Sequence, residues 1–540
     1  MLTTRIFLFA CWIMLVEGLM AAPFGRVIPI GGQASDLAID ESRGVLYIAN
    51  FTANRIEVMS LADGAIQTSI NVAPQPGSLS LSPDGRWLLI AHYGATPGGT
   101  APRNSLTLID LTTNSRQNFV LSAPPLGVAF GLDNLALVVT TSDFLLFDPL
   151  LGTTRQLETV QGVTAKTIPQ PAASFPSQIT TASVAASGDG LSIFGLTDTI
   201  RFRYDVNTKG IVSQGYTSTP AQAPRVVSVN RDGTRIAMGW ALHDRRGLLI
   251  AQHGNALGLL NVGGHVVDSA RGVIYTQVPP AALTAPTTPT TPTTPTTPTT
   301  PTTPTTPASG AGTAAGPVIE QVLQVVDIDN LAVRERIQIQ ENLAGKGVLS
   351  SDNNTAYIIS DSGVSIFPVG QLAQARKLNA SVQDLMFLGN FCDRRISTQE
   401  FTLSDPSGGA TDFTITSIPG VVVSPATGTT PAVIRVSIDP NTYANTRGTV
   451  SRQMEIKSTG AVNLPPTVRL LINNREPDQR GATVNISGTL VDLIAAVGLA
   501  ARDAGASGVY WLTAEDNATA RRVYDRLATL TPFRVYEQNL

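Results

Sequence analysis

Four histidines, His92, His243, His253 and His265, are the side chains of this sequence best suited to metal binding or to general base catalysis near neutral pH. Their spacing gives no His-Glu-x-x-His motif and no close His-x-His pair, so it does not predict a metal site. The sequence also has no Gly-x-Ser-x-Gly nucleophile elbow and no Walker phosphate loop. We therefore expect no metal and no bound cofactor, and we expect the histidines to lie in hydrogen-bonded core or rim positions.

A second candidate for chemistry lies in the tail, residues 477–540, where the pattern becomes helical from Leu493 onward. The run from Tyr510 to Tyr524, YWLTAEDNATARRVY, resembles the second cofactor motif of GNAT-type N-acetyltransferases. The resemblance implies that Asn517 contacts the coenzyme A arm and that Tyr524 protonates the leaving thiolate. The Gly-rich pyrophosphate loop of that family is missing, since Leu490 and Val491 stand in its place. The alternative interpretations are that Asn517 is a helix cap and that Tyr524 is an ordinary core residue. We predict that the tail is a partial GNAT-like α/β unit.

The elements that position the remaining polar residues recur along the chain. An apolar strand, a tight polar turn, a second apolar strand and a third strand that ends on a polar residue are found seven times, mostly 40 to 55 residues apart. The clearest copies pair residues 37–40 with 44–49 and residues 79–85 with 87–91, and Asp84-Gly85 supplies a hairpin turn. Near-continuous apolar runs indicate strands that are buried on both faces. We predict a mainly β fold with a seven-bladed β-propeller over residues 23–385.

Two details of this prediction concern single strands. Residues 26–30 form an orphan strand before the first repeat, and we expect them to complete the seventh blade and so to close the ring. In the fifth repeat the apolar residues 248–250 are the predicted third strand.

The first two repeats also carry a family resemblance. Ser82-Pro-Asp-Gly-Arg86, Ala49-Asn50 and the segment 54–58 resemble the YVTN-type propellers of bacterial surface and exported proteins. That resemblance implies a binding or interaction platform. A minority of related folds, the lactonases, hydrolyse sugar lactones, which leaves a propeller hydrolase as an alternative.

A threonine- and proline-rich segment interrupts the sixth repeat. Between Pro286 and Pro307 the unit Thr-Thr-Pro is repeated seven times, which disfavours helix and strand pairing and favours an extended chain. The first two strands of the sixth repeat precede this segment and the third follows it. We therefore predict a disordered insertion, residues 279–317, within blade six, and a linker between two domains is the alternative.

After the repeats, residues 386–476 alternate apolar and polar side chains with frequent turns, a pattern typical of a β-sandwich. The segments 424–432, 438–440 and 443–448 resemble bacterial immunoglobulin-like modules of exported proteins. The resemblance implies a spacer or adhesion-type module.

The first 22 residues have the pattern of a secretory signal peptide, with Arg5, an apolar run and small residues near Ala22. The apolar run is too short to span a bilayer, so we expect no membrane span after cleavage. Cys11 would leave with the signal, and Cys392 would then be unable to form an intrachain disulfide. We predict a secreted, periplasmic or cell-surface protein.

Charge narrows the range of functions. The 37 basic and 40 acidic residues give a net charge of −3 without a long block of either sign, which argues against nucleic-acid binding. Our leading hypothesis is a non-catalytic exported scaffold that binds protein or polysaccharide through the propeller faces and the rim loops 94–104 and 243–255. The first alternative is a lactonase-like hydrolase, which requires His92, His243 or His265 to converge with carboxylates. The second is N-acetyl transfer by the tail.

Overall fold

The computed structural model describes residues 23–93, 104–166, 176–216, 226–254, 263–278, 321–390, 397–439, 441–443 and 448–475. Within these residues the chain is almost entirely β-strand, which confirms the prediction of a mainly β fold. The helical elements of this part are one short helix, α1 (Val160–Ala165), which the sequence analysis did not predict, and one 3-10 turn, η1 (Val369–Gln371). The signal segment, the insertion 279–317 and the tail 477–540 lie outside the described residues.

Residues 26–367 form seven four-stranded antiparallel sheets in the described part of the chain. The first three sheets are β2 (Ala34–Asp40), β3 (Val45–Asn50), β4 (Arg55–Ser60), β5 (Ile66–Asn71); β6 (Pro76–Leu81), β7 (Trp87–His92), β8 (Ser105–Asp110), β9 (Ser115–Val120); and β10 (Pro125–Phe130), β11 (Ala136–Thr140), β12 (Asp143–Asp148), β13 (Thr153–Thr159). The next three are β14 (Ala182–Ala186), β15 (Ser192–Thr197), β16 (Ile200–Asp205), β17 (Gly210–Tyr216); β18 (Val227–Val229), β19 (Arg235–Met238), β20 (Ala241–Asp244), β21 (Leu249–Gln252); and β22 (Gly264–Asp268), β23 (Val273–Gln277), β24 (Val322–Asp327), β25 (Val333–Gln338). The last sheet is β26 (Leu343–Leu349), β27 (Ala356–Ser360), β28 (Gly363–Phe367) and β1 (Arg26–Pro29).

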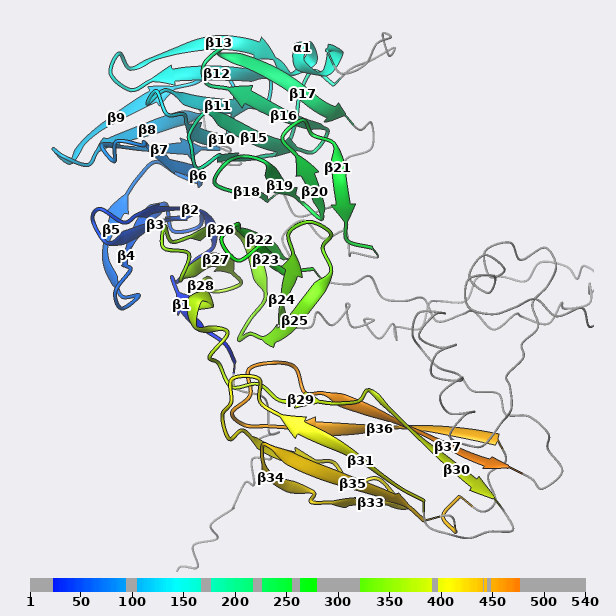
Figure 1. Ribbon diagram of the computed structural model, residues 1–540. Helices are drawn as coiled ribbons and strands as arrows, with labels where there is room; N and C mark the ends of the chain where they lie inside the picture. The colour runs from blue at the N-terminus through cyan, green and yellow to red at the C-terminus, as the bar shows by residue number, and fades with distance from the viewer. Residues whose placement is uncertain are drawn as a thin grey trace, which may run out of the picture.

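The seven sheets are arranged as a closed ring (Figure 1). The first strand of each sheet contacts the first strand of the next, from β2 through β6, β10, β14, β18 and β22 to β26, and β26 contacts β2. Because the sheets twist and meet only at their inner strands, they radiate from a common axis, which is the architecture of a β-propeller.

The buried strands explain why the sequence reads as near-continuous apolar runs. In β3, Leu46 and Ile48 pack toward the seventh sheet in a core that includes Ile359. The alternate residue Tyr47 packs toward the second sheet, in a core that includes Leu88. Successive side chains of a strand point to opposite faces, so a strand between two neighbours needs apolar residues at both parities.

The N-terminal strand closes the ring. β1 pairs with β28 in antiparallel register, with Val27 opposite Ser365 and Ile28 opposite Val364. This is the pairing that the orphan strand in the sequence predicts. Because β26, β27 and β28 come from the other end of the repeat region, the pairing fastens the two ends of the ring together.

The sixth and fifth sheets give different outcomes for two strand predictions. β23 pairs with β24, so the two strands that flank the Thr/Pro-rich segment are neighbours in one sheet, as the repeat pattern predicts. The predicted third strand of the fifth sheet, residues 248–250, is wrong. The third strand is β20, which turns directly from β19 through Gly239-Trp240, and residues 249–252 are the outer strand β21.

A second module follows the ring and consists of two sheets that share one apolar core. One sheet has the order β29 (Asn379–Ala380), β31 (Ser397–Ser404), β35 (Ala432–Ile438), β33 (Val421–Ser424); the other has the order β30 (Asp384–Asn390), β37 (Thr467–Arg475), β36 (Gly448–Lys457), β32 (Asp412–Ile415), β34 (Thr427–Thr429). The expected boundary at 385/386 falls inside β30, so the module begins earlier, at β29. The pairing of β30 with β37 is parallel, which alternation along a single strand cannot reveal.

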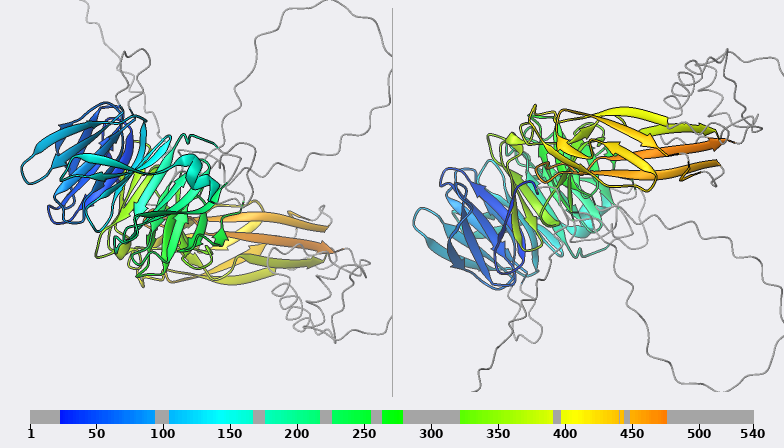
Figure 2. Two further views of the ribbon diagram at one scale, coloured as in Figure 1. Left: turned by 90° about the horizontal axis from the view of Figure 1, so that it is seen from above. Right: turned by 90° about the horizontal axis from the view of Figure 1, so that it is seen from below.

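The second module, coloured yellow to orange, lies beside the ring (Figure 2). It is attached to the outer strand of the sixth sheet. The N–H of Gln338 donates to the carbonyl of Val462 at 2.9 Å, and the N–H of Leu464 donates to the carbonyl of Arg336 at 3.0 Å. Between these two bonds, Ile337 forms a β-bridge with Asn463. The connection between β36 and β37 therefore covers part of the edge of β25, which would otherwise present unpaired backbone groups.

Candidate functional site

The inner strands of the ring surround two cavities along the axis. We call the face at which the inner strands begin the upper face. The upper cavity opens there, has a volume of about 810 Å³ and includes residues 32–36 among its walls. The lower cavity, at the opposite end, has a volume of about 780 Å³ and includes residues 346–351. Val184 and Lys346 line both cavities, so they mark the level at which the two meet.

The strand ends that flank the longer connections of the ring lie at the upper face. In an antiparallel four-stranded sheet whose first strand begins at the upper face, the second and fourth strands end there. The described ends on either side of 94–103, 167–175, 217–225, 255–262 and 279–320 are all of this kind. The first-to-second-strand turns at the lower face are tight, as at Gly85 with φ 69°. The described strand ends that flank these gaps therefore lie at one end of the ring, and loops at one end of a scaffold commonly form a recognition surface.

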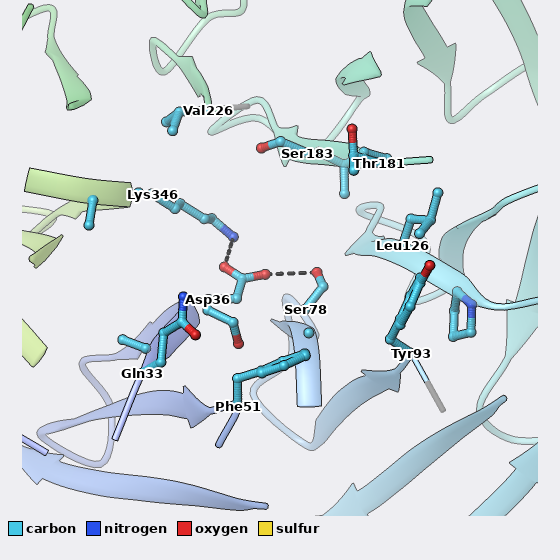
Figure 3. Close-up of a pocket in the computed structure, with 18 of the residues that line it drawn as sticks. Gln33, Asp36, Phe51, Ser78, Tyr93, Leu126, Thr181, Ser183, Val226 and Lys346 are labelled. Atoms are coloured by element: carbon cyan, nitrogen blue, oxygen red, sulfur yellow. Dashed lines mark hydrogen bonds and ion pairs between the residues drawn. The ribbon is translucent and has the colours of Figure 1, made fainter. Parts of the chain in front are cut away.

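A buried ion pair lies where the two cavities meet (Figure 3). The ammonium of Lys346 on β26 lies 2.8 Å from Oδ1 of Asp36 on β2. Oδ2 of Asp36 accepts a hydrogen bond from the Ser78 hydroxyl at 2.7 Å and from the N–H of Leu79 at 2.9 Å. The Ser78 oxygen in turn accepts from the N–H of Val128 at 3.2 Å.

This chain of contacts joins the inner strands β26, β2, β6 and β10, which belong to four consecutive sheets. The side chains of Lys346 and Asp36 are only 19% and 8% exposed. The Asp36 carboxylate is held by an ammonium, a hydroxyl and a backbone N–H, so it connects neighbouring inner strands of the ring. The N–H of Leu37 also donates to Oδ1 of Asp36 at 2.8 Å, so four donors engage the carboxylate and it is poorly placed to take a proton from a ligand.

The mouth of the upper cavity combines aromatic and polar side chains. Phe51 and Tyr93 follow the second strands of the first and second sheets, and Figure 3 shows both at the cavity wall with Gln33. Tyr93 is 36% exposed. Ser183 and Thr181 face the same space from the fourth sheet.

Two hydroxyl groups of the cavity wall have no hydrogen-bond partner in the described structure. They belong to Thr181 and Ser360, and both oxygen atoms are covered from solvent. Ser360 is only 3% exposed. A buried hydroxyl without a partner costs free energy. Because both oxygen atoms are covered, neither of them is open to the cavity.

Asp361 adds a carboxylate at the rim of the same cavity. Partial burial is the main cause that raises the pKa of Asp361 above its ordinary value, and the negative charge of Glu341 raises it further. The amide of Asn342 donates to Asp361 at 3.4 Å and acts in the opposite direction.

The histidines do not converge at either cavity. His92 lies in the second sheet, where Nε2 is 2.8 Å from the Thr107 hydroxyl. His243 lies on β20 beside the guanidinium of Arg201. His265 lies on β22 and contacts Ser228, and His253 and His265 meet only in a separate space of about 10 Å³.

Burial is the largest cause that lowers the pKa of His92, His243 and His265, each to about 4, so these imidazoles are neutral at pH 7. Among the described residues no group of three or more His, Cys, Asp or Glu side chains is arranged to hold a metal ion. The geometry that the lactonase-like alternative requires, histidines with carboxylates in one pocket, is not found in the described part of the ring.

The other predicted site residues have mixed outcomes. Asn517 and Tyr524 lie outside the described residues, as does most of the rim segment 94–104. The rim segment 243–255 was only partly right. His243 belongs to β20 and is 2% exposed, and residues 249–252 form β21.

Sequence reasoning missed Asp36, Ser78 and Lys346. No motif marks them. The available signal was their position, since each is a polar residue within or next to an apolar inner strand of a repeat, where a water-exposed side chain is not expected.

The ring of radiating four-stranded sheets and its axial cavities define this part of the chain as a β-propeller. No family model matches the sequence. The chain is 30% identical over 121 residues to "Antigen Lp49" of Leptospira interrogans serogroup Icterohaemorrhagiae serovar copenhageni (strain Fiocruz L1-130). That match covers 21% of this chain and 26% of the relative, so it spans about a quarter of the relative's length.

Several solved structures resemble the chain at low sequence identity. The β-propeller domain of Cps50 (Swd1) from Myceliophteria thermophila is 11% identical, with 64% of this chain and 100% of that chain covered and a TM-score of 0.41. Hydrazine synthase from Kuenenia stuttgartiensis is 11% identical, with 64% and 98% covered and a TM-score of 0.42. U3-55K is 9% identical, with 65% and 99% covered and a TM-score of 0.43.

Proposed function

We propose that this chain is an exported, non-catalytic binding scaffold. Its ring acts as a seven-bladed propeller that contacts a protein or polysaccharide of the cell envelope through the upper face. The two-sheet module is proposed to be immunoglobulin-like and to hold the propeller at a fixed orientation. The signal-like residues 1–22 support export, and the proposed location is secreted, periplasmic or at the cell surface.

The upper cavity is the observation that carries this proposal. It is wide and open, and the charged pair at its base, Lys346 and Asp36, is engaged in holding the ring together. A site of this kind offers shape and hydrogen bonds to a partner. The repeated framework supports the proposal further, because it holds the mouth residues of different sheets in fixed positions.

Binding is tested with the full chain immobilised and exposed to separated envelope protein and polysaccharide fractions. Two matched variants distinguish the faces: Ser183→Tyr narrows the upper cavity, and Ser269→Tyr adds the same side chain at the lower cavity. We expect Ser183→Tyr to reduce retention of the bound component and Ser269→Tyr to leave it unchanged. Equal effects of the two variants would reject the upper face as the contact surface, and no retention by the unmodified chain would reject the scaffold proposal.

Export is tested separately. The full-length gene product should be recovered from the periplasm, the cell surface or the medium, with an N-terminus near Pro23. In the described part of the chain, no helix combines the length and apolar character needed to cross a bilayer. Recovery of uncleaved chain from the cytoplasm would contradict this part of the proposal.

A further inference from the structure

We propose that the upper cavity binds a neutral, polyhydroxylated ligand, namely the terminal residues of a saccharide chain. The inference rests on the proposed binding function and specifies the ligand class of the same face. It is argued from the charge, the hydrogen-bonding groups, the aromatic side chains and the size of the cavity.

The charge of the cavity disfavours anionic ligands. At its base, the positive charge of Lys346 and the negative charge of Asp36 neutralise each other at 2.8 Å. At its rim, Asp361 and the nearby Glu341 repel anions. A neutral polar ligand avoids the repulsion at the rim and meets no net charge from the pair at the base.

The hydrogen-bonding groups of the cavity include both donors and acceptors. Among the described residues, the Lys346 ammonium contacts Asp36. An ammonium has three N–H donors, so it can also donate to a ligand. The side chains of Gln33 and Ser183 line the cavity and make no hydrogen bond within the described structure, and each can donate and accept. Sugar hydroxyl groups also donate and accept, so they can satisfy such a mixed set without a fixed charge.

Aromatic side chains stand at the entrance. Phe51 and Tyr93 come from adjacent sheets, and both line the cavity near its mouth (Figure 3). The apolar C–H face of a pyranose ring can pack on an aromatic ring while the sugar hydroxyls reach the polar wall. The volume of about 810 Å³ lies within the range of roughly 300–1,000 Å³ that is usual for small-ligand sites.

The test is a calorimetric titration of the full chain with cellotriose, maltotriose, xylotriose, mannotriose and triacetylchitotriose as neutral probes, and with trigalacturonic acid as the anionic probe. We expect at least one neutral trisaccharide to bind with a dissociation constant between roughly 10 μM and 1 mM. Binding of trigalacturonic acid alone, or no binding of any neutral probe at millimolar concentration, would overturn the inference.

Two pairs of variants locate the binding. A Cβ added at Gly77 would have no atom closer than 3.9 Å, so Gly77→Phe can fill the cavity from the inner edge of the second sheet. Its control is Thr68→Phe, on the exposed outer strand β5. We expect Gly77→Phe to abolish trisaccharide binding and Thr68→Phe to retain it, with both variants folded by circular dichroism.

The second pair of variants does not require the fold to accommodate a larger side chain. Tyr93→Ala should weaken binding by roughly 3- to 10-fold, which corresponds to the loss of one aromatic stacking contact. Tyr93→Phe keeps the ring and should retain the affinity. Trisaccharide binding that is unchanged in both Gly77→Phe and Tyr93→Ala would place the ligand elsewhere and overturn the inference. The neutral probes could fail to bind while the chain still retains an envelope protein and Ser183→Tyr reduces that retention. In that case the scaffold proposal stands and only the saccharide inference is rejected.

Discussion

The ammonium of Lys346 and the carboxylate of Asp36 lie 2.8 Å apart at the centre of the ring and join its last inner strand to its first. The N-terminal strand β1 closes the same ring at its outside, by pairing with β28. Closure is therefore made twice, by an ion pair near the axis and by a backbone ladder at the periphery. The two contacts can be tested independently because they share no residue.

Lys346→Met should destabilise the protein, because it leaves the buried carboxylate of Asp36 without its cation. Loss of one partner from a buried pair typically costs 3–5 kcal/mol, and we expect about 2–3 kcal/mol here because Ser78 and Leu79 still donate to Asp36. Urea unfolding measures the change. The double variant Asp36→Asn, Lys346→Met should recover part of the loss, and a double variant as unstable as the sum of the two single variants would show that the pair does not act as a unit.

Ile28→Pro should open the peripheral closure. The N–H of Val27 donates outward to the Gln340 side chain and that of Ile30 donates to Ser362 at the end of β28, so by alternation the N–H of Ile28 also points toward β28. Proline removes this donor, and we expect a loss of roughly 1–3 kcal/mol and a lower melting temperature. Val27→Pro is the matched control, since it removes the exposed bond to the Gln340 side chain but no bond to β28, and we expect a smaller loss from it. Equal melting temperatures for the two variants would contradict the closing role of β1.

Acid should destabilise the folded chain between pH 6.5 and about 4. The pKa of His92 and that of His265 are lowered from 6.5 to about 4, mainly by burial. The unfolded chain therefore binds these protons first as the pH falls, so stability that is present above pH 6.5 is lost on the way to pH 4. Each imidazole accounts for up to about 3 kcal/mol.

The measurement is the free energy of unfolding by urea at a series of pH values. His92→Gln should flatten the slope between pH 6.5 and 4 relative to the unmodified chain, while carboxylates with lowered pKa values act at more acidic pH. An unchanged slope in His92→Gln would show that this imidazole is not held neutral by the fold.

Asn463→Ala should loosen the connection between β36 and β37, whose residues Val462 and Leu464 make the backbone bonds to the ring. The side-chain oxygen of Asn463 accepts from the N–H of Leu378 at 2.8 Å, and its amide donates to the carbonyl of Leu378 at 2.9 Å. Their loss should cost roughly 1–3 kcal/mol per unpaired group and broaden the distribution of distances between the two modules. Spin labels at Thr68 and Thr398 measure that distribution, with the exposed Asn441→Ala as the control. A distribution as narrow as that of the unmodified chain would contradict this role of Asn463.

The strands were more predictable than the site. In the first two repeats, near-continuous apolar runs and the Asp84-Gly85 turn give the strands within a residue or two, because hairpin turns and burial on both faces are local properties of the sequence. The prediction of the third strand in the fifth repeat was wrong because the turn at Gly239-Trp240 lacks an Asx-Gly signal. The four-residue strand β20 was therefore overlooked. The helix α1 was missed for a similar reason, since six residues give too little periodicity to detect.

The amino-acid sequence by itself determined that this chain is a repeated, mainly β protein whose N-terminal strand has no partner nearby. Burial pattern and turn chemistry depend on neighbours in the sequence, so they can be read there. Only the tertiary structure decided where Asp36, Ser78 and Lys346 meet, which histidines are isolated, and which wall hydroxyls lack a partner. The physical reason is that the axial cavity is formed by one short strand from each sheet, and the distances between those strands are set by packing between sheets and by closure of the ring.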